Sequence, residues 1–404
     1  MLRSIAAVFL LLLSSLLSAQ EPSINPVLLK SHWKADWITI SEAPARAYGV
    51  YHFRKTFSLP SSPSSFVIHV TADNRYRLYV NGMPVCNGPA RGDLYNWYFE
   101  TVDIAPYLKA GENVIAALVW NMGEHAAVAQ ISNQTAFALQ GNTATEELVN
   151  TDESWKVYQN EAYTPCSLDN MEKLNSYMAI GPGDHVKAAL YPWGWEKPGY
   201  DDTKWLKPLV LAKPAPAGYG TDNRWTLAPR NIPLMEERFQ PIPAIRKITG
   251  IKTSAHSLDS SHPFVIPANT TASILFDQTY NTVAYPELIV SGGRNAVVRI
   301  TYAEALFKEG KKGNRNEIEG KEMIGNYDVF ETDGGDKRLF RPLWLRTFRY
   351  VQLDITTAGQ PLTINDFYGQ FTGYPFEEKA KFSSNDPSLQ RIWDVGWRTA
   401  RLCA

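Results

Sequence analysis

The stretch Ala72–Trp97, ADNRYRLYVNGMPVCNGPARGDLYNW, constrains the fold more than any other part of the chain. Its RYRLYV segment has the period-two alternation of a half-buried strand. Asn81-Gly82 tolerates the positive φ angles of a type I′ turn, so Met83–Cys86 is expected to return as the second strand of a β-hairpin. Charged and aromatic loop residues follow. They suit a sugar-binding edge, and they equally suit an ordinary jelly-roll edge whose aromatic side chains fill the core.

Similar strand patterns, separated by turn residues, recur in two blocks of the chain. NVIAALVW (residues 113–120) is apolar on both faces, as expected for a central strand between two layers. Later segments such as ILFDQTY, AVVRITYAEAL and RTFRYVQLDI are rich in β-branched and aromatic residues. The sequence therefore predicts an all-β protein with two consecutive β-sandwich domains of the jelly-roll type.

The C-terminal segment changes to a helical period. Asn385 or Asp386 can cap a helix, and Pro387 suits its first position. Apolar residues then recur at spacings of three and four and define one face, which includes two tryptophans. Such a face is costly to leave in water, so we expect the second sandwich or a further helical domain to cover it. The residues of this face are Leu389, Ile392, Trp393, Gly396, Trp397, Ala400 and Cys403.

Turn signals and composition divide the chain into six segments. Met1–Gln20 has a basic start, a short apolar run and a small-residue cleavage site, so it is predicted to be a secretory signal and the protein to be periplasmic or extracellular. The predicted segments are 1–20 (signal), 21–47 (approach segment docked by tryptophans), 48–205 (first sandwich with a loop-rich excursion), 206–237 (linker), 238–376 (second sandwich) and 377–404 (start of a helical domain).

Composition excludes several classes of function. The chain has 40 basic and 41 acidic residues, a net charge of −1, so neither a nucleic-acid nor a membrane-surface partner is indicated. Its seven histidines lack metal-ligand spacing, and we expect no metal and no cofactor. With three cysteines the chain lacks a disulfide framework; Cys86 and Cys166 are expected to be buried free thiols, a single bond between them being the alternative.

Carboxylate pairs are the remaining route to hydrolysis, because glycosidases place two acids on opposite sides of the scissile bond. Glu317, Glu319 and Glu322 cluster in the charged loop GKKGNRNEIEGKEMIG (310–325), where solvation is the ordinary outcome. We predict no catalytic residue in the chain. Trp193 and Trp195, two residues apart, offer aromatic platforms for sugar rings, although tryptophans in loops more often pack the loop.

Several motifs together resemble the N-terminal part of bacterial α-L-rhamnosidases, which are inverting glycoside hydrolases with an (α/α)6 catalytic barrel. The likeness runs from about Trp33 to Ala404 and is strongest in the second block and the final helix; the RLYVNG hairpin is shared with jelly-rolls of β-galactosidase type. The motifs are ADNRYRLYVNG with GPARGD, PWGWE, LAPRNIPLMEE, TYAEALF, GNRNEIEGK, RPLWLRTFRYVQL and SSNDPSLQRIWDVGWRTARLCA.

The resemblance implies that the catalytic carboxylates lie on a helical barrel beyond this chain, and that the sandwiches brace that barrel. The alternatives are a stand-alone carbohydrate-binding protein and a fragment of a β-galactosidase-type enzyme. The implied partner is a rhamnose-containing oligosaccharide or glycoside. Arg346 and Arg349 are equally compatible with a structural role. The candidates for sugar or interdomain contacts are Arg91, Asp93, Trp97, Trp193, Trp195, Arg315 and Glu317.

Overall fold

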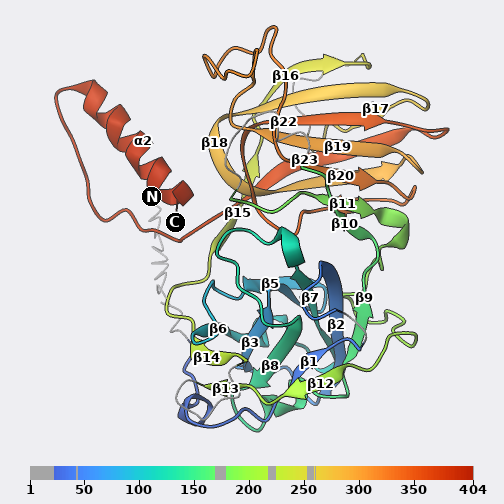
Figure 1. Cartoon of the computed structure of the whole chain (residues 1–404), viewed down its shortest axis with the longest axis vertical. Helices are drawn as coiled ribbons and strands as arrows, with labels where there is room; N and C mark the ends of the chain where they lie inside the picture. The colour runs from blue at the N-terminus through green and yellow to red at the C-terminus, as the bar shows by residue number, and fades with distance from the viewer. Residues whose placement is uncertain are drawn as a thin grey trace, which may run out of the picture.

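The computed structural model describes residues 22–41, 44–168, 179–216, 224–252, 259 and 261–403. The predicted signal segment lies outside the described residues. Two β-sandwiches stand one above the other, and the α-helix α2 (Pro387–Cys403) follows them (Figure 1). The predicted all-β class with two sandwiches and a terminal helix is therefore confirmed.

The first sandwich consists of two sheets with an apolar core between them. The core is built from alternate residues of facing strands, such as Phe53 and Phe137, whose rings lie 5.3 Å apart. One sheet has the order β12 (Leu209–Ala212), β1 (Trp37–Thr39), β8 (Ala136–Gly141), β3 (Val67–Asp73), β6 (Trp97–Asp103), β14 (Thr226–Pro229), β13 (Ala215–Pro216). The other has the order β5 (Met83–Gly88), β4 (Arg75–Val80), β7 (Gly111–Asn121), β2 (Gly49–Leu59), β9 (Lys156–Gln159).

The hairpin predicted from the sequence is present as β4 and β5. Asn81 and Gly82 have φ angles of 51° and 84°, as a type I′ turn requires. The Asn81 amide fixes the turn further by donating to the Tyr107 carbonyl at 2.8 Å. β7, which contains the NVIAALVW segment, lies between β4 and β2 as a central strand. Local sequence therefore specifies this part of the sheet.

The second sandwich is built around the long strand β18 (Thr271–Gly292). Its first half pairs with β22 (Arg346–Thr356) and β16 (Ala244–Thr249), and its second half pairs with β23 (Leu362–Gly373) and β21 (Arg338–Phe340). The register with β22 shifts between Asp277 and Thr282, and the pairing with β22 then continues to Ala284. The other strands of this sheet are β10 (Tyr163–Pro165), β11 (Asp184–Lys187), β20 (Tyr327–Glu331), β19 (Val297–Ala303), β15 (Glu236–Pro241) and β17 (Phe264–Ile266).

Hydrogen bonding crosses the segment boundaries that the sequence suggested. β10 and β11 come from the range assigned to the first sandwich, yet β11 pairs in parallel with β20 of the second. β12, β13 and β14 come from the assigned linker, and β1 comes from the approach segment, yet all four belong to a sheet of the first sandwich. The two sandwiches are therefore tied together by strands as well as by side chains.

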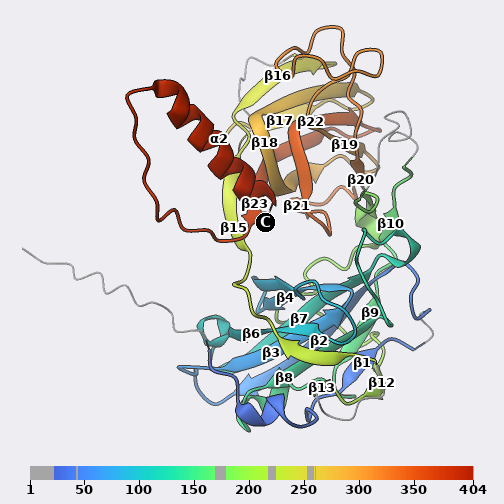
Figure 2. The same ribbon diagram turned by 60° about the vertical axis from the view of Figure 1, so that its left-hand side comes forward.

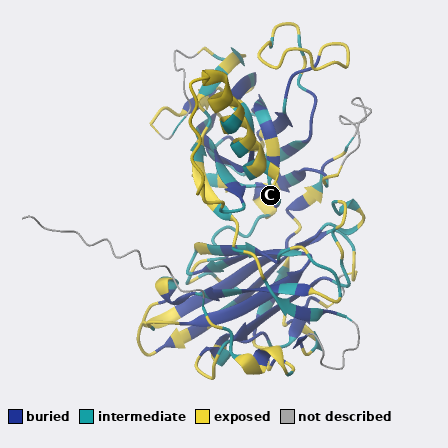
Figure 3. Cartoon of the chain, turned by 90° about the vertical axis from the view of Figure 1, so that its left-hand side faces the viewer, coloured by how far each residue is buried: buried dark blue, intermediate teal, exposed yellow. Residues whose placement is uncertain are grey.

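Short helices and the terminal helix complete the chain. In the part of the chain that the structure describes, five 3₁₀ helices lie in connections: η1 (Pro26–Leu29), η2 (Ala105–Tyr107), η3 (Gly123–His125), η4 (Glu146–Val149) and η5 (Ala188–Leu190). The helix α2 (Pro387–Cys403) spans the range predicted from the period. It contacts the second sandwich near its C-terminal end, where Arg398 lies over the Tyr280 ring at 4.4 Å, while most of its surface is exposed (Figure 3). Cys86, Cys166 and Cys403 are free thiols, and the first two are buried as expected.

Gly183 provides a test of how β11 docks on the second sandwich. A Cβ atom at this position would overlap the Tyr327 carbonyl oxygen of the strand that β11 adjoins. We expect Gly183→Ala to force these segments apart and to lower the free energy of unfolding by about 1–3 kcal/mol. Gly359→Ala, at a site with no atom within 4 Å of the added methyl, is the matched control and should leave stability unchanged. Equal midpoints of denaturant unfolding for the two variants would contradict the prediction.

Candidate functional site

A cleft of about 650 Å³ lies where the β4–β5 hairpin faces the second sandwich. The hairpin is at the top of the lower domain, and β15, β21 and β23 are above it (Figure 2). One wall comes from β4, β5 and the loop after β5, and the other from the segments around Tyr285 and Trp344. The connection before β15 adds Arg230, Ile232 and Leu234. Five arginines line this interdomain cleft: Arg75, Arg77, Arg91, Arg230 and Arg341.

Arg75 is held flat against the second sandwich. Its guanidinium lies 4.5 Å from the ring centre of Trp344, and it donates to the Pro89 carbonyl at 2.6 Å and to the Gln130 side-chain oxygen at 3.1 Å. These acceptors are neutral oxygens, so they do not neutralise its charge. Burial, together with the nearby charge of Arg91, lowers the pKa of Arg75 to about 10. The cleft thus contains a cation whose charge is incompletely compensated.

Tyr285 is placed between two further guanidinium groups. Arg77 lies over its ring at 5.5 Å and Arg341 at 4.2 Å. Arg77 also donates to the Pro342 carbonyl at 3.3 Å, which joins the hairpin to the second sandwich. Because Arg75 and Arg77 alternate with buried residues along β4, both point from the same face of the strand into the cleft.

Arg341 and Arg230 also have carboxylate partners. Arg341 pairs with Glu287 at 3.0 Å and with Glu237 at 2.8 Å. Arg230 pairs at 3.1 Å with Glu100, a fully buried carboxyl that also accepts from the Tyr76 hydroxyl at 2.6 Å. Burial raises the pKa of Glu100, while Arg230 opposes the shift. These ion pairs hold the walls of the cleft in place. The charges of Arg341 and Arg230 are therefore neutralised by carboxylates of the chain itself.

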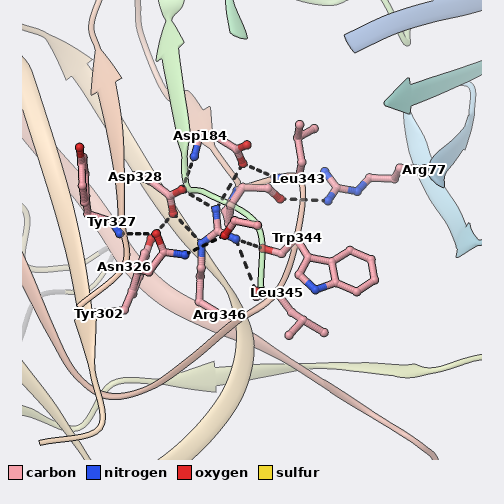
Figure 4. A network of polar contacts seen from close by, with 12 residues as sticks. Arg77, Asp184, Tyr302, Asn326, Tyr327, Asp328, Leu343, Trp344, Leu345 and Arg346 are labelled. Carbon is pink, nitrogen blue, oxygen red and sulfur yellow. Dashed lines mark hydrogen bonds and ion pairs between the residues drawn. The ribbon is translucent and has the colours of Figure 1, made fainter. Parts of the chain in front are cut away.

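A second polar cluster lies next to the cleft and joins strands β11, β19, β20 and β22 (Figure 4). Arg346 on β22 donates through Nε to Asp328 Oδ2 at 3.1 Å, and its Nη2 lies 3.5 Å from Asp184 Oδ2 on β11. Asp328 accepts the backbone N–H of Asp184 at 2.7 Å and the hydroxyl of Tyr302 at 2.7 Å. Asp184 also accepts the backbone N–H of Leu343 at 2.7 Å.

The surroundings of Asp184 and Asp328 indicate a structural role for this pair of carboxylates. Asp184 and Asp328 are 1% and 0% exposed, so substrate does not reach them. Burial and the neighbouring Asp328 raise the pKa of Asp184 to about 7, and Arg346 opposes the shift. Because the acceptor positions are occupied by a guanidinium, a tyrosine and backbone amides, the pair anchors β11 to the second sandwich.

The first three predicted site residues lie in different surroundings. Arg91 is exposed on the rim of the interdomain cleft. Asp93 closes its own loop by accepting from the backbone N–H groups of Tyr95 at 2.8 Å and Asn96 at 2.9 Å. Trp97 is 3% exposed and packs with Phe99 and Leu227 in a small core of the first sandwich. The structure therefore brings Arg91 alone of these three to the cleft.

Trp193 and Trp195 pack rather than project into solvent. Trp193 lies under Arg338 of the second sandwich, with the guanidinium 4.5 Å from its ring centre, so it makes an interdomain contact. Trp195 is 1% exposed and its ring lies 4.1 Å from His52. An exposed sugar-stacking platform at Trp195 is inconsistent with this burial, because the indole is needed to fill the core.

The charged-loop candidates lie away from the cleft. Arg315 and Glu317 are exposed, and the Arg315 carbonyl anchors the loop by accepting from Tyr350 at 2.6 Å. Glu317 lies 3.7 Å from Lys321. Arg349 pairs with Asp277 at 2.9 Å, and Arg346 forms the buried cluster described above, so both arginines hold strands and carboxylates together.

Sequence reasoning missed the residues that make the interdomain cleft cationic. Arg75 and Arg77 were visible as the alternating residues of a strand, and Arg230 and Arg341 lie in the motifs LAPRN and RPLWLR. Their convergence depends on the packing of the two sandwiches, which residue spacing does not encode. Among the described residues there is no group of three or more His, Cys, Asp or Glu side chains arranged to hold a metal ion. None of the described helices is long and apolar enough to cross a membrane.

The fold is shared with several solved rhamnosidase structures. A GH78 family rhamnosidase of Bacillus sp. GL1 matches with a TM-score of 0.76 at 14% identity, over 92% of this chain and 58% of that one. The α-L-rhamnosidase of Dictyoglumus thermophilum matches with a TM-score of 0.62 at 18% identity, over 92% and 39%. That of Streptomyces avermitilis, solved with L-rhamnose, matches with a TM-score of 0.61 at 20% identity, over 88% and 32%.

The family match is specific to the first part of the chain. Residues 61–217 match the family model of the α-L-rhamnosidase N-terminal domain, in agreement with the resemblance seen in the sequence. No curated protein matches the sequence. The chain spans between about a third and three fifths of the rhamnosidase structures described above.

The buried arginine cluster has a testable role in stability. Asp328→Asn removes the nearer of the two carboxylates that face the buried Arg346 guanidinium and leaves Asp184 at 3.5 Å. We expect a loss of about 1.5–3 kcal/mol in the free energy of unfolding, as for a hydrogen bond to a charged group. Asp394→Asn is the matched control, since Asp394 is exposed on α2 and accepts one hydrogen bond from Gln390. Urea unfolding of both variants measures the difference, and a Asp328→Asn protein as stable as the control would exclude the anchoring role.

His52 makes the stability depend on pH. It is fully buried beside Trp195 and Asn160, and burial lowers its pKa from 6.5 to about 3. The unfolded chain therefore binds a proton below pH 6.5 that the folded chain does not bind, so stability falls as the pH decreases from about 6.5 to about 3. His52 alone should change the folding equilibrium by about tenfold per pH unit in this window.

Comparison of two variants isolates this contribution. His52→Gln should reduce the pH slope of the unfolding free energy, because a neutral side chain that cannot titrate still accepts the Asn160 amide. His262→Gln should keep the slope, because His262 is on the surface beside Asp259. An unchanged slope in His52→Gln, measured by denaturant titrations at several pH values, would contradict the assignment.

Proposed function

We propose that this chain is the N-terminal accessory portion of an α-L-rhamnosidase that releases terminal α-L-rhamnose from glycosides or polysaccharides. The observation that carries the proposal is the family match of residues 61–217, supported by the shared fold over most of the chain. Rhamnosidases of this fold are glycoside hydrolases, and this chain corresponds to part of their length.

In this proposal the catalytic acid and base lie outside the chain. The carboxylates described above are engaged or solvated: Asp184 and Asp328 are buried around Arg346, and Glu317 is exposed in the charged loop. An inverting glycosidase needs two carboxyl groups roughly 6.5–9.5 Å apart with a water molecule between them. The residues of this chain would position and support a catalytic domain rather than activate water.

The terminal helix is the proposed contact to that domain. Ile392 and Val395 of α2 are 66% and 61% exposed, whereas Trp393 donates to Glu378 at 2.8 Å and stacks on Phe382 with ring centres 5.8 Å apart. Burial of large apolar side chains is favourable, so this face suits packing against further helices. We also propose that the protein acts in the periplasm or outside the cell, on the composition of Met1–Gln20.

An activity assay on two lengths of the protein tests the proposal. The 404-residue chain should not hydrolyse a chromogenic aryl α-L-rhamnoside, because the proposal places the catalytic carboxylates outside it. The same chain extended by the reading frame downstream of Ala404 should hydrolyse it. Turnover by the shorter chain would disprove the placement of the catalytic residues, and hydrolysis of an aryl β-galactoside alone by the longer one would disprove the substrate.

A further inference from the structure

The interdomain cleft has a chemistry that a purely bracing role does not require. Its walls contribute five guanidinium groups, and Glu237 is the acidic side chain that lines it. Arg341 is neutralised by Glu237 and Glu287, and Arg230 by Glu100. Arg77 is partly compensated by the nearby Glu237. The hydrogen bonds of Arg75 go instead to one amide oxygen and one carbonyl oxygen. The cleft is therefore positive in a protein whose net charge is −1.

Bringing these arginines together in the cleft costs free energy, because their positive charges repel one another. Arg75 and Arg77 are packed between the two sandwiches, and Arg91 stands at the rim close to Arg75. Cations that are forced together in partly dehydrated surroundings repel one another, and a bound anion relieves that repulsion. A guanidinium also presents paired N–H donors that match the two oxygens of a carboxylate.

The remaining surface of the cleft is apolar and aromatic. Trp344 and Tyr285 line one wall, and Ile232, Leu234 and Val85 line others. Pyranose rings have apolar C–H faces that pack on such surfaces, whereas a free inorganic anion gains nothing from them. The volume of about 650 Å³ is in the range of small-molecule sites and is sufficient for one or two sugar residues.

We propose that this cleft binds a carboxylate-bearing sugar, a hexuronate, with the carboxylate held by Arg75 and Arg91 and the ring held against the Trp344 side. The choice of a sugar over other carboxylates rests on the proposed function, since a rhamnosidase region that also binds uronate would hold an acidic polysaccharide. The site lies between the two sandwiches and is built from residues of this chain alone.

Calorimetric titration of the 404-residue chain tests the ligand class. D-galacturonate and D-glucuronate are the probes, and D-galactose, the neutral methyl ester of galacturonate and sodium acetate are the controls. We expect binding of at least one uronate to be about tenfold or more tighter than that of its neutral ester, since hydrogen bonds to a charged group are lost in the ester. Acetate should bind weakly because it lacks the ring.

Variants locate the site. Arg91→Gln removes an exposed cation from the rim and should weaken uronate binding severalfold, roughly as expected for one charge-assisted hydrogen bond. Arg315→Gln is the matched control, because Arg315 is an exposed arginine on the charged loop and does not line the cleft. Arg75→Gln should abolish binding; if this variant fails to fold, the Arg91 and Arg315 pair decides the question.

Three results would overturn the proposal. These are equal affinity for uronate and its ester, equal affinity of Arg91→Gln and Arg315→Gln for uronate, and binding of acetate as tight as that of uronate. The titration uses no catalysis, so it fails independently of the rhamnoside assay. Loss of uronate binding would leave the rhamnosidase assignment intact, and a failed rhamnoside assay would leave the anionic site intact.

Discussion

A single buried guanidinium, that of Arg346, determines how the two halves of the molecule meet. Asp328 binds it directly, and Asp184 faces it from β11, which lies in sequence between strands of the first sandwich. Such a cluster contributes little net stability when complete, but it permits very few alternative arrangements, because any displaced charge is left buried without a partner. The docking of β11 on β20, the position of the β4–β5 hairpin and the shape of the interdomain cleft all depend on this cluster around Arg346.

The interdomain cleft follows from that geometry. With β11 docked in parallel on β20, the hairpin β4–β5 faces the segment containing Trp344, and Arg75 stacks on that ring. The arginines of the first sandwich thus meet aromatic residues of the second. Cation–π contacts hold both the walls and the charges of the cleft, so binding capacity and interdomain rigidity come from the same side chains.

Local features of the structure were predictable from the sequence, and long-range ones were not. The Asn81-Gly82 turn and the helix from Pro387 were both specified by a few neighbouring residues, and both are present. The pairing of the short segment DHVK with β20 was not predictable, because a four-residue strand carries too little pattern to select a partner over 140 positions away. The burial of Trp195 and the convergence of Arg75 with Arg230 have the same cause.

The parallel docking of β11 on β20 has a consequence for how the polypeptide behaves as a whole. The segment that contains β10 and β11 leaves the first sandwich, forms an edge of the second sandwich's sheet and returns, so the second sandwich is complete only when this segment is present. Proteolytic cleavage at the connection near Arg230 would therefore yield one piece with every strand of the first sandwich and a second piece that lacks β10 and β11. The second sandwich is thus not a separable module, because an edge of its sheet comes from a segment that lies between strands of the first.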